Sequence, residues 1–418
     1  MKMKLCTGLL AISLLLQLTT AMAYPFDGYE YTGIRRLARL AQVIEGKFKG
    51  TKPPSGGLRI LTDIKLNLLG ARGDSLAVLP AENAKLQKEI QALFPNRDES
   101  YSLALLDITP GKPLRFASQQ MNRQFMPGSV GKLAIAAGLF TELQRLYPES
   151  VENRHRLLKT RQIKADRWII YDSHEVPVFN VESNTFASRA IREGDVFSLY
   201  EWADHMLSAS ANAAASIVWK ELILMREFGE RYPVSYEEEV AYFKNTPKSQ
   251  LSQIAISTVN DPLRTIGISE NDWRLGSFFT KTGQSIVPGG GSYGNPKALV
   301  QFLIALERGR LVDEWSSLEI KRLMYMTARR IRYASSPALE KAAVYFKSGS
   351  QYRCKEEPGF TCGKYMGNVE NYMNSVAIVE QADGRIYLVA LMSNVLRKNS
   401  AVEHQTLATF IDRIVAKP

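Results

Sequence analysis

Ser129 and Lys132 are the first residues of this chain whose types and spacing suggest chemistry. They follow Pro127-Gly128 and stand three positions apart, where the apolar run Leu133 to Phe140 begins. The spacing predicts a buried helix from Ser129, with the hydroxyl and the amine on one face of its first turn. The dipole at a helix N-terminus favours developing negative charge, and a free backbone N–H there can face an oxyanion. The pair fits an activated nucleophile, although a serine cap beside an exposed lysine would show the same pattern.

Two more polar clusters interrupt apolar patterns further along the chain. Ser208 to Asn212 separates two apolar helical stretches, where the polar residues either face a cleft or cap the second helix. Lys347-Ser348-Gly349 ends an extended stretch that begins at Val344. Ser129-x-x-Lys132, Ser210-Ala211-Asn212 and Lys347-Ser348-Gly349 thus appear in the order of a three-part signature.

With these three motifs the chain resembles the superfamily of active-site serine hydrolases that contains class A β-lactamases and penicillin-binding proteins. The resemblance runs from about Ala81 to the C-terminus. It implies that Ser129 is the acylated nucleophile and that Lys132 is its general base or proton relay. Ser210 would pass a proton to the leaving nitrogen, and Asn212 would hold the substrate amide.

The same resemblance implies a role for each residue of the third motif. Lys347 would attract the substrate carboxylate, and Ser348 would hydrogen-bond it. Gly349 would let the ligand backbone lie against the strand edge, and the N–H groups of Ser350 and Ser129 would form the oxyanion hole. No cofactor or metal is implied.

The chain departs from the class A pattern in its second half. A second Lys-Thr-Gly stands at Lys281-Thr282-Gly283, but glycines and helical patterns follow it instead of a pairing strand, so Lys347 is the better candidate. Ala211 replaces the usual aspartate of the middle motif. No Glu-x-x-x-Asn lies between Ala213 and Asn295, and the nearest candidate, Glu270, has Arg274 at the partner position. The sequence therefore supports acylation better than rapid turnover.

The functional hypothesis is an exported serine hydrolase that forms an acyl-enzyme on Ser129 with a β-lactam or a related amide. The alternatives are a penicillin-binding D,D-peptidase or an esterase with slow deacylation, or a non-catalytic cell-wall-binding protein on the same fold. The partner would be a small β-lactam or a cell-wall peptide. Nucleic acid is excluded, because no dense Lys/Arg run with interleaved aromatics accompanies the formal charge of +11.

Two other groups of residues offer different chemistry. Gly290-Gly291-Ser292-Tyr293-Gly294 matches the nucleophile elbow of α/β-hydrolases, with Asp313 and His404 following, but the elbow needs a strand directly before it and Pro288 breaks the short candidate. Metal chemistry has no support, because the four histidines lie in no ligand spacing and each is more simply a surface or core residue: His155, His174, His205 and His404.

The elements around these motifs indicate an α+β fold. Strand patterns occur at Tyr101 to Ile108 and, near the other end, in a hairpin over Ser375 to Met392, with helical patterns between. We expect an antiparallel sheet built from both chain ends and flanked by helices, with a mostly helical middle subdomain. Residues 231 to 296 read as loop-rich.

The N-terminal region divides into two parts. Residues 1–23 read as a signal peptide, with Lys2 and Lys4 before an apolar stretch and Ala21-Met22-Ala23 as a cleavage site, which predicts a periplasmic or secreted protein. Residues 24–80 form an extension without recognisable chemistry, and 81–418 form the hydrolase domain. No later stretch is long and apolar enough to span a membrane. Cys354 and Cys362 then remain as a candidate local disulfide.

Overall fold

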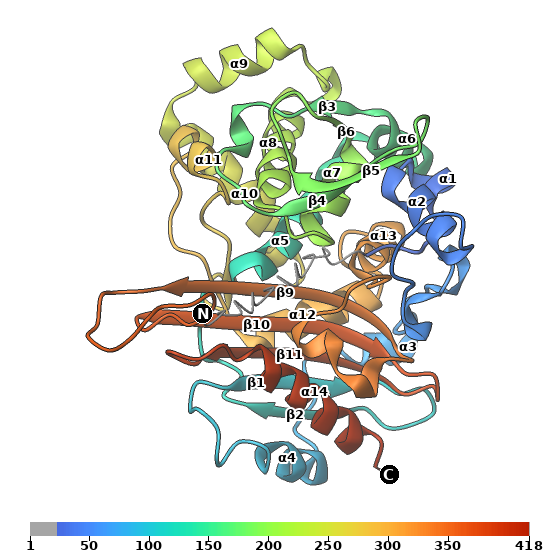
Figure 1. Ribbon diagram of the computed structural model, residues 1–418, viewed down its shortest axis with the longest axis vertical. Coiled ribbons are helices and arrows are strands. Elements are labelled where there is room, and N and C mark those ends of the chain that lie inside the picture. Colours follow the sequence, from blue (N-terminus) through green and yellow to red (C-terminus); the bar gives the residue numbers. More distant parts are fainter. Residues whose placement is uncertain (1–22, 418) are drawn as a thin grey trace, which may run out of the picture.

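A five-stranded antiparallel sheet organises the computed structural model, which describes residues 23–417. The strand order is β2-β1-β11-β10-β9 (Figure 1). The strands are β1 (Ser102–Asp107), β2 (Arg115–Gln119), β9 (Ala343–Arg353), β10 (Glu370–Glu380) and β11 (Ile386–Asn394). Because β1 pairs with β11, the two ends of the chain meet in one sheet, and the predicted α+β class is confirmed.

Both faces of the sheet are buried under helices. Leu103 and Leu105 point into one apolar cluster, and their neighbours Ala104 and Leu106 point into another, as the two-residue period of a strand requires. The first cluster includes residues of α4 (Ala84–Gln91) and α14 (Ala401–Val415), and the second those of α5 (Lys132–Leu146) and α12 (Pro296–Glu307).

The middle of the chain forms a mostly helical half above the sheet (Figure 1). At its centre α5 is buried almost throughout and packs against α8 (Asn212–Phe228) and α10 (Lys248–Thr265). A Cβ on Gly138 of α5 would lie 2.5 Å from the carbonyl oxygen of Thr258, so only glycine permits this approach. The other helices here are α6 (Val151–Thr160), α7 (Leu199–Leu207), α9 (Tyr236–Asn245), α11 (Lys281–Ile286) and α13 (Glu314–Met324).

The expectation that residues 231 to 296 are loop-rich is wrong, because α9 and α10 occupy much of this stretch. The buried apolar stripe of α10 recurs only at every fourth residue: Leu251, Ala255, Val259 and Leu263. Pro262 lies within α10, near its C-terminal end. Three small strand pairs were also not predicted: β3 (Gln162–Lys164) with β6 (Val196–Ser198), β4 (Glu175–Asn180) with β5 (Thr185–Ala190), and β7 (Trp273–Arg274) with β8 (Tyr293–Gly294).

Residues 23–80 wrap along one side of both halves, in the blue part of Figure 1. They form α1 (Tyr29–Thr32), α2 (Arg35–Ile44) and α3 (Ala71–Asp74). Leu37 and Leu40 of α2 are buried in the same apolar cluster as α5 and α7. Arg36 makes a buried ion pair with Asp204 of α7, with Nε 2.6 Å from Oδ2. The segment shares the core of the rest of the chain, and the boundary at residue 80 stays a prediction.

The proposed signal peptide lies outside the described residues, apart from Ala23. Within residues 23–417, no helix combines the length and the apolar character needed to cross a bilayer.

Candidate active site

Ser129 lies in a single 3-10 turn, η3 (Gly128–Gly131), that leads directly into α5. The helix therefore begins at Lys132, three residues later than predicted. Gly128 has a φ of +54°, and a Cβ there would lie 2.8 Å from the backbone nitrogen of Ser350. A glycine is needed because the turn carries a left-handed residue directly against β9.

Lys132 is fully buried, and its ammonium group contacts all three polar residues expected around it. Nζ lies 3.0 Å from Ser129 Oγ, 2.7 Å from Asn212 Oδ1 and 2.6 Å from the carbonyl oxygen of Ser210. Burial lowers the pKa of Lys132 to about 7, against an opposing effect of the Asp172 charge. A large share of the amine is thus neutral at neutral pH and can accept the Ser129 proton.

The loop between α7 and α8 presents Ser210 and Asn212 to the lysines. Ser210 has a φ of +59°, and its Oγ accepts a hydrogen bond of 2.8 Å from Lys347 Nζ. It also lies 3.4 Å from Lys132 Nζ, so one hydroxyl lies between two amines. The alternative, that these polar residues cap α8, is not what the structure shows: the N-cap residue Ala211 makes no side-chain capping bond, and the Ala213 N–H donates instead to Asp172.

β9 is an edge strand that contributes the third motif. A Cβ on Gly349 would lie 2.1 Å from the carbonyl oxygen of Pro127, so the strand can approach the Ser129 turn only with glycine here. Lys347 is buried, and its pKa lies well below the usual value because of burial first, and then the charges of Lys132 and Arg332. The backbone nitrogen of Ser350 lies against the turn that contains Ser129.

Arg332 belongs to the site although no sequence pattern pointed to it. It begins the 3-10 turn η6 (Arg332–Ser335) with a φ of +51°. Its guanidinium donates 2.8 Å to the carbonyl oxygen of Gly349 and 3.0 Å to Ser350 Oγ, and it lies 5.1 Å from the centre of the Tyr365 ring. Burial lowers its pKa. In the sequence it resembles its neighbours Arg329 and Arg330, so only the fold distinguishes it.

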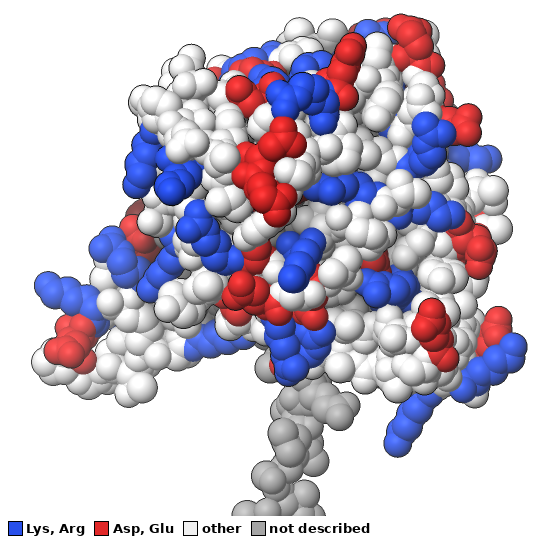
Figure 2. All heavy atoms as spheres, turned by 90° about the horizontal axis from the view of Figure 1, so that it is seen from above, with Lys and Arg blue, Asp and Glu red and all other residues white. Residues whose placement is uncertain are grey.

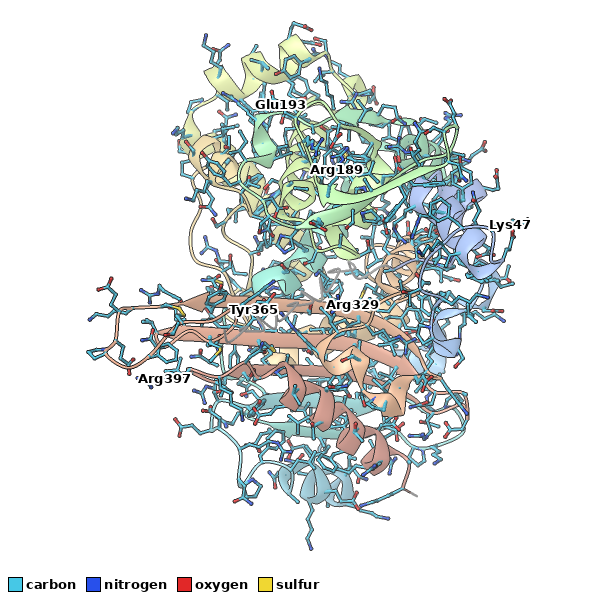
Figure 3. The ribbon with its side chains drawn as sticks, viewed as in Figure 1. Lys47, Arg189, Glu193, Arg329, Tyr365 and Arg397 are labelled. Carbon is cyan, nitrogen blue, oxygen red and sulfur yellow. A yellow bond between two sulfur atoms is a disulfide. The ribbon has the colours of Figure 1, made fainter. Side chains whose placement is uncertain are left out.

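Two cavities meet at the nucleophile. The larger, of about 870 Å³, lies between the sheet and the helical half, and the smaller, of about 150 Å³, is lined by Arg332, Lys347 and Ser348. Five residues line both cavities: Ser129, His174, Ala209, Ser350 and Tyr365. Tyr365 lies at the level of β9 (Figure 3), on the loop that follows the Cys354–Cys362 disulfide. The predicted disulfide is thus confirmed. His174 is a cleft residue, whereas the sequence favoured a surface or core position.

The other sequence candidates lie in separate structural roles. Lys281 to Gly283 form the first turn of α11, capped by Thr280, and not a strand end. Glu270 is exposed and pairs with Arg274 at 3.1 Å. One carboxylate, Glu175, lines the larger cavity in the described part of the chain.

The residues of the α/β-hydrolase hypothesis make hydrogen bonds that do not assemble a catalytic triad. Ser292 Oγ accepts a hydrogen bond from the Gly276 N–H, and Asp313 caps α13. His404 is buried between the hydroxyls of Ser375 and Ser393, at 3.0 Å from each. No group of three or more His, Cys, Asp or Glu side chains suited to a metal ion occurs within residues 23–417.

Comparison with known proteins places this geometry in a family. No functionally curated protein matches the sequence. Among solved structures, the TLA-3 extended-spectrum β-lactamase is 12% identical, with a TM-score of 0.52 over 79% of this chain and 98% of its own. The TLA-1 extended-spectrum β-lactamase is also 12% identical, with a TM-score of 0.51 over 81% of this chain and 100% of its own. A class A β-lactamase from Bacteroides cellulosilyticus DSM 14838 is 14% identical, with a TM-score of 0.49 over 79% of this chain and 95% of its own.

The two TLA enzymes share the fold of this chain, and the family assignment rests on the sequence. The model of the beta-lactamase enzyme family matches residues 85–416 of the 418. The protein therefore belongs to the beta-lactamase enzyme family of active-site serine hydrolases.

Proposed function

We propose that this protein is an exported serine hydrolase that forms an acyl-enzyme with a β-lactam on Ser129. The observation that carries the proposal is the 3.0 Å contact between Ser129 Oγ and a buried lysine whose pKa lies at about 7. Lys132 takes the Ser129 proton as Oγ attacks the lactam carbonyl. The N–H groups of Ser129 and Ser350 hold the oxyanion, and Ser210 gives a proton to the leaving nitrogen.

The substrate is an anion held by the cationic cavity. Lys347 and Arg332, both buried, face the cavity that Ser348 also lines, and a carboxylate there offsets their desolvation. Asn212 holds the substrate amide. Tyr24 to Pro80 would be an extension of the same structural unit, since it shares the apolar core with the hydrolase domain.

The face of the molecule shown in Figure 2 gives no support to a polyanion as partner. In Figure 2 blue and red side chains alternate over the face seen from above, and no broad patch of one sign dominates it. A small molecule in the cleft is therefore the proposed ligand, and a cell-wall peptide is the larger candidate for the same site.

Intact-mass measurement after mixing with penicillin tests the proposal. We expect an adduct of one penicillin per chain that is absent in Ser129→Ala. Lys281→Arg, in the first turn of α11, serves as the control and forms the adduct as the unmodified protein does. An adduct that decays as penicillin is consumed indicates a β-lactamase, and one that persists indicates a penicillin-binding peptidase. No adduct and no consumption would refute the proposal.

A further inference from the structure

His174 and Asp172 form a side-chain pair at the cleft that the steps above do not use. His174 Nδ1 lies 2.6 Å from Asp172 Oδ1, and the backbone N–H of His174 donates to the same oxygen at 3.0 Å. The other carboxylate oxygen of Asp172 accepts a hydrogen bond of 2.8 Å from the N–H of Ala213, next to Asn212. The carboxylate is thus anchored to α8, and the imidazole is anchored to the carboxylate.

The pair combines a buried partner with an accessible ring. The Asp172 side chain is 5% exposed and that of His174 is 38% exposed. Burial by itself would raise the pKa of Asp172, but hydrogen bonds from His174 and Ala213 outweigh it, so the pKa is lowered and the carboxylate is charged. Within residues 23–417, Nε2 of His174 has no hydrogen-bond partner and is available to a water molecule.

The histidine of the pair faces the same cavities as the nucleophile. His174 lines both cavities together with Ser129, and the Asp172 charge is close enough to Lys132 to influence its pKa. The one carboxylate that lines the larger cavity within residues 23–417, Glu175, accepts a hydrogen bond from Ser188 across the β4–β5 hairpin and is exposed.

We propose that His174, positioned by Asp172, is the general base that activates water to hydrolyse the Ser129 ester. This inference rests on the proposed function, because it needs an acyl-enzyme on Ser129. A histidine in contact with a carboxylate is suited to this step, because the carboxylate fixes the tautomer with Nε2 unprotonated and stabilises the imidazolium that forms.

The step balances without any further reactant. Nε2 of His174 takes one proton from water while the water oxygen bonds to the ester carbon, which gives a tetrahedral oxyanion. The oxyanion collapses, the bond from carbon to Ser129 Oγ breaks, and Oγ takes the proton from the imidazolium. The product is a free carboxylic acid, and Ser129 and His174 return to their starting states.

The test separates formation of the ester from its hydrolysis. With penicillin as the acylating agent, His174→Gln should form the Ser129 adduct at the unmodified rate but lose it at least about 100-fold more slowly. Asp172→Asn should likewise form the adduct at the unmodified rate and hydrolyse it more slowly. In His174→Ala, added imidazole should restore hydrolysis of the accumulated adduct, which a merely structural role would not allow.

His155→Gln is the matched control, because it makes the same change at a histidine that stacks on Tyr31 and lines neither cavity, and its adduct lifetime should not change. The inference is overturned if the His174→Gln adduct hydrolyses at the unmodified rate, or if Glu175→Gln slows hydrolysis and His174→Gln does not. If the unmodified protein forms no adduct, the proposed function fails instead, so the two failures are distinguishable.

Discussion

Three buried cations, Lys132, Lys347 and Arg332, lie together around the nucleophile. Burial lowers the pKa of each of them, and for Lys347 the charges of the other two add to the effect. Because they lie close together, it is unfavourable for all three groups to be charged at once. An anionic ligand would offset their positive charge and is therefore favoured. In the proposed function, the same three residues serve both the proton transfer and the recognition of an anionic substrate.

The first prediction concerns the pH dependence of acylation. Lys132 accepts the Ser129 proton only when neutral, and its pKa is lowered to about 7, so the amine is protonated below this pH and neutral above it. The acylation rate with penicillin should therefore rise from pH 5.5 through about 7 and level off by about pH 8.5. Stopped-flow measurement of adduct formation checks this.

Two substitutions accompany that measurement. Lys132→Arg, which stays protonated, should lower acylation at least about 100-fold at every pH. Lys281→Arg makes the same substitution on α11, and its acylation rate should depend on pH as in the unmodified protein. A rate that does not change between pH 5.5 and 8.5 would contradict the assignment of Lys132 as base.

The second prediction concerns Arg332. A hydrogen bond to a charged group contributes about 1.5–3 kcal/mol, so Arg332→Gln should raise the KM for penicillin about 10- to 100-fold. The variant should also lose the preference for penicillin over its methyl ester, because the ester lacks the carboxylate. Arg330→Gln is the matched control, since Arg330 donates to the carbonyl oxygen of Ala342 and to no residue of the site. If the preference survives in Arg332→Gln, another cation holds the carboxylate.

At the scale of elements, β10 stabilises the turn that contains Ser129. Asn374 is fully buried in β10, and its Nδ2 donates to the carbonyl oxygens of Met126 at 2.9 Å and Pro127 at 3.1 Å. Met126 and Pro127 directly precede Gly128 and Ser129 in the chain. The sheet therefore fixes the turn through one amide group, in addition to the backbone of β9.

The third prediction tests this connection. Asn374→Ala should lower the free energy of unfolding by about 1–3 kcal/mol and also slow acylation of the folded protein. Asn371→Ala removes a similar buried amide from β10, which donates to the carbonyl oxygens of Val395 and Lys398. It should destabilise the protein to a similar extent without slowing acylation. Urea denaturation and the acylation rate, measured on both variants, separate positioning from stability.

The elements that the sequence predicted well are those with a strong local signal. The apolar run Tyr101 to Ile108 contains β1, and the hairpin expected over Ser375 to Met392 lies within the pair β10 and β11. In each case the local pattern and the tertiary environment favour the same structure.

The site was only partly predictable for a related reason. Ser129, Lys132, Ser210 and Lys347 stand in recognisable motifs, whereas Arg332 and His174 stand in loops without any pattern. Arg332 reaches the site because η6 packs beside β9 and β10. Side chains that meet through tertiary packing leave no periodic signal, so they are found only in the structure.

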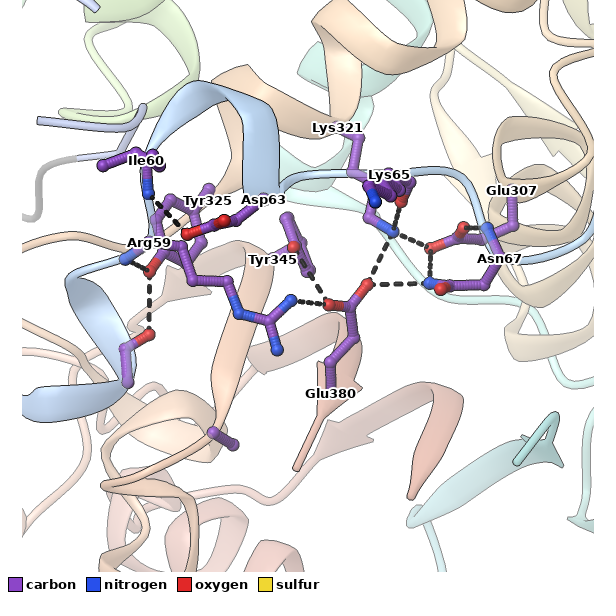
Figure 4. Close-up of polar contacts among 12 residues, drawn as sticks. Arg59, Ile60, Asp63, Lys65, Asn67, Glu307, Lys321, Tyr325, Tyr345 and Glu380 are labelled. Atoms are coloured by element: carbon purple, nitrogen blue, oxygen red, sulfur yellow. Dashed lines mark hydrogen bonds and ion pairs between the residues drawn. The ribbon is translucent and has the colours of Figure 1, made fainter. Parts of the chain in front are cut away.

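At the scale of the whole molecule, a buried ionic network joins four segments (Figure 4). Lys321 of α13 lies 2.6 Å from Glu307 of α12 and 2.7 Å from Glu380 of β10. Asn67 donates to both carboxylates, and Arg59 pairs with Glu380. Burial raises the pKa of Glu307 despite Lys321, whereas Lys321 and Arg59 together outweigh burial at Glu380 and lower its pKa.

The last prediction follows from this network, which links residues 23–80 to the helices and the sheet. Lys321→Met leaves two buried carboxylates without their shared cation, so the free energy of unfolding should fall by about 3–5 kcal/mol. Arg59→Gln removes a partly exposed cation from the same network and should cost about 1 kcal/mol or less. Urea denaturation of both variants at pH 7 measures the difference. Equal losses in the two variants would mean that Lys321 is not the centre of the network, and that the N-terminal segment is held mainly by Leu37, Leu40 and their apolar neighbours.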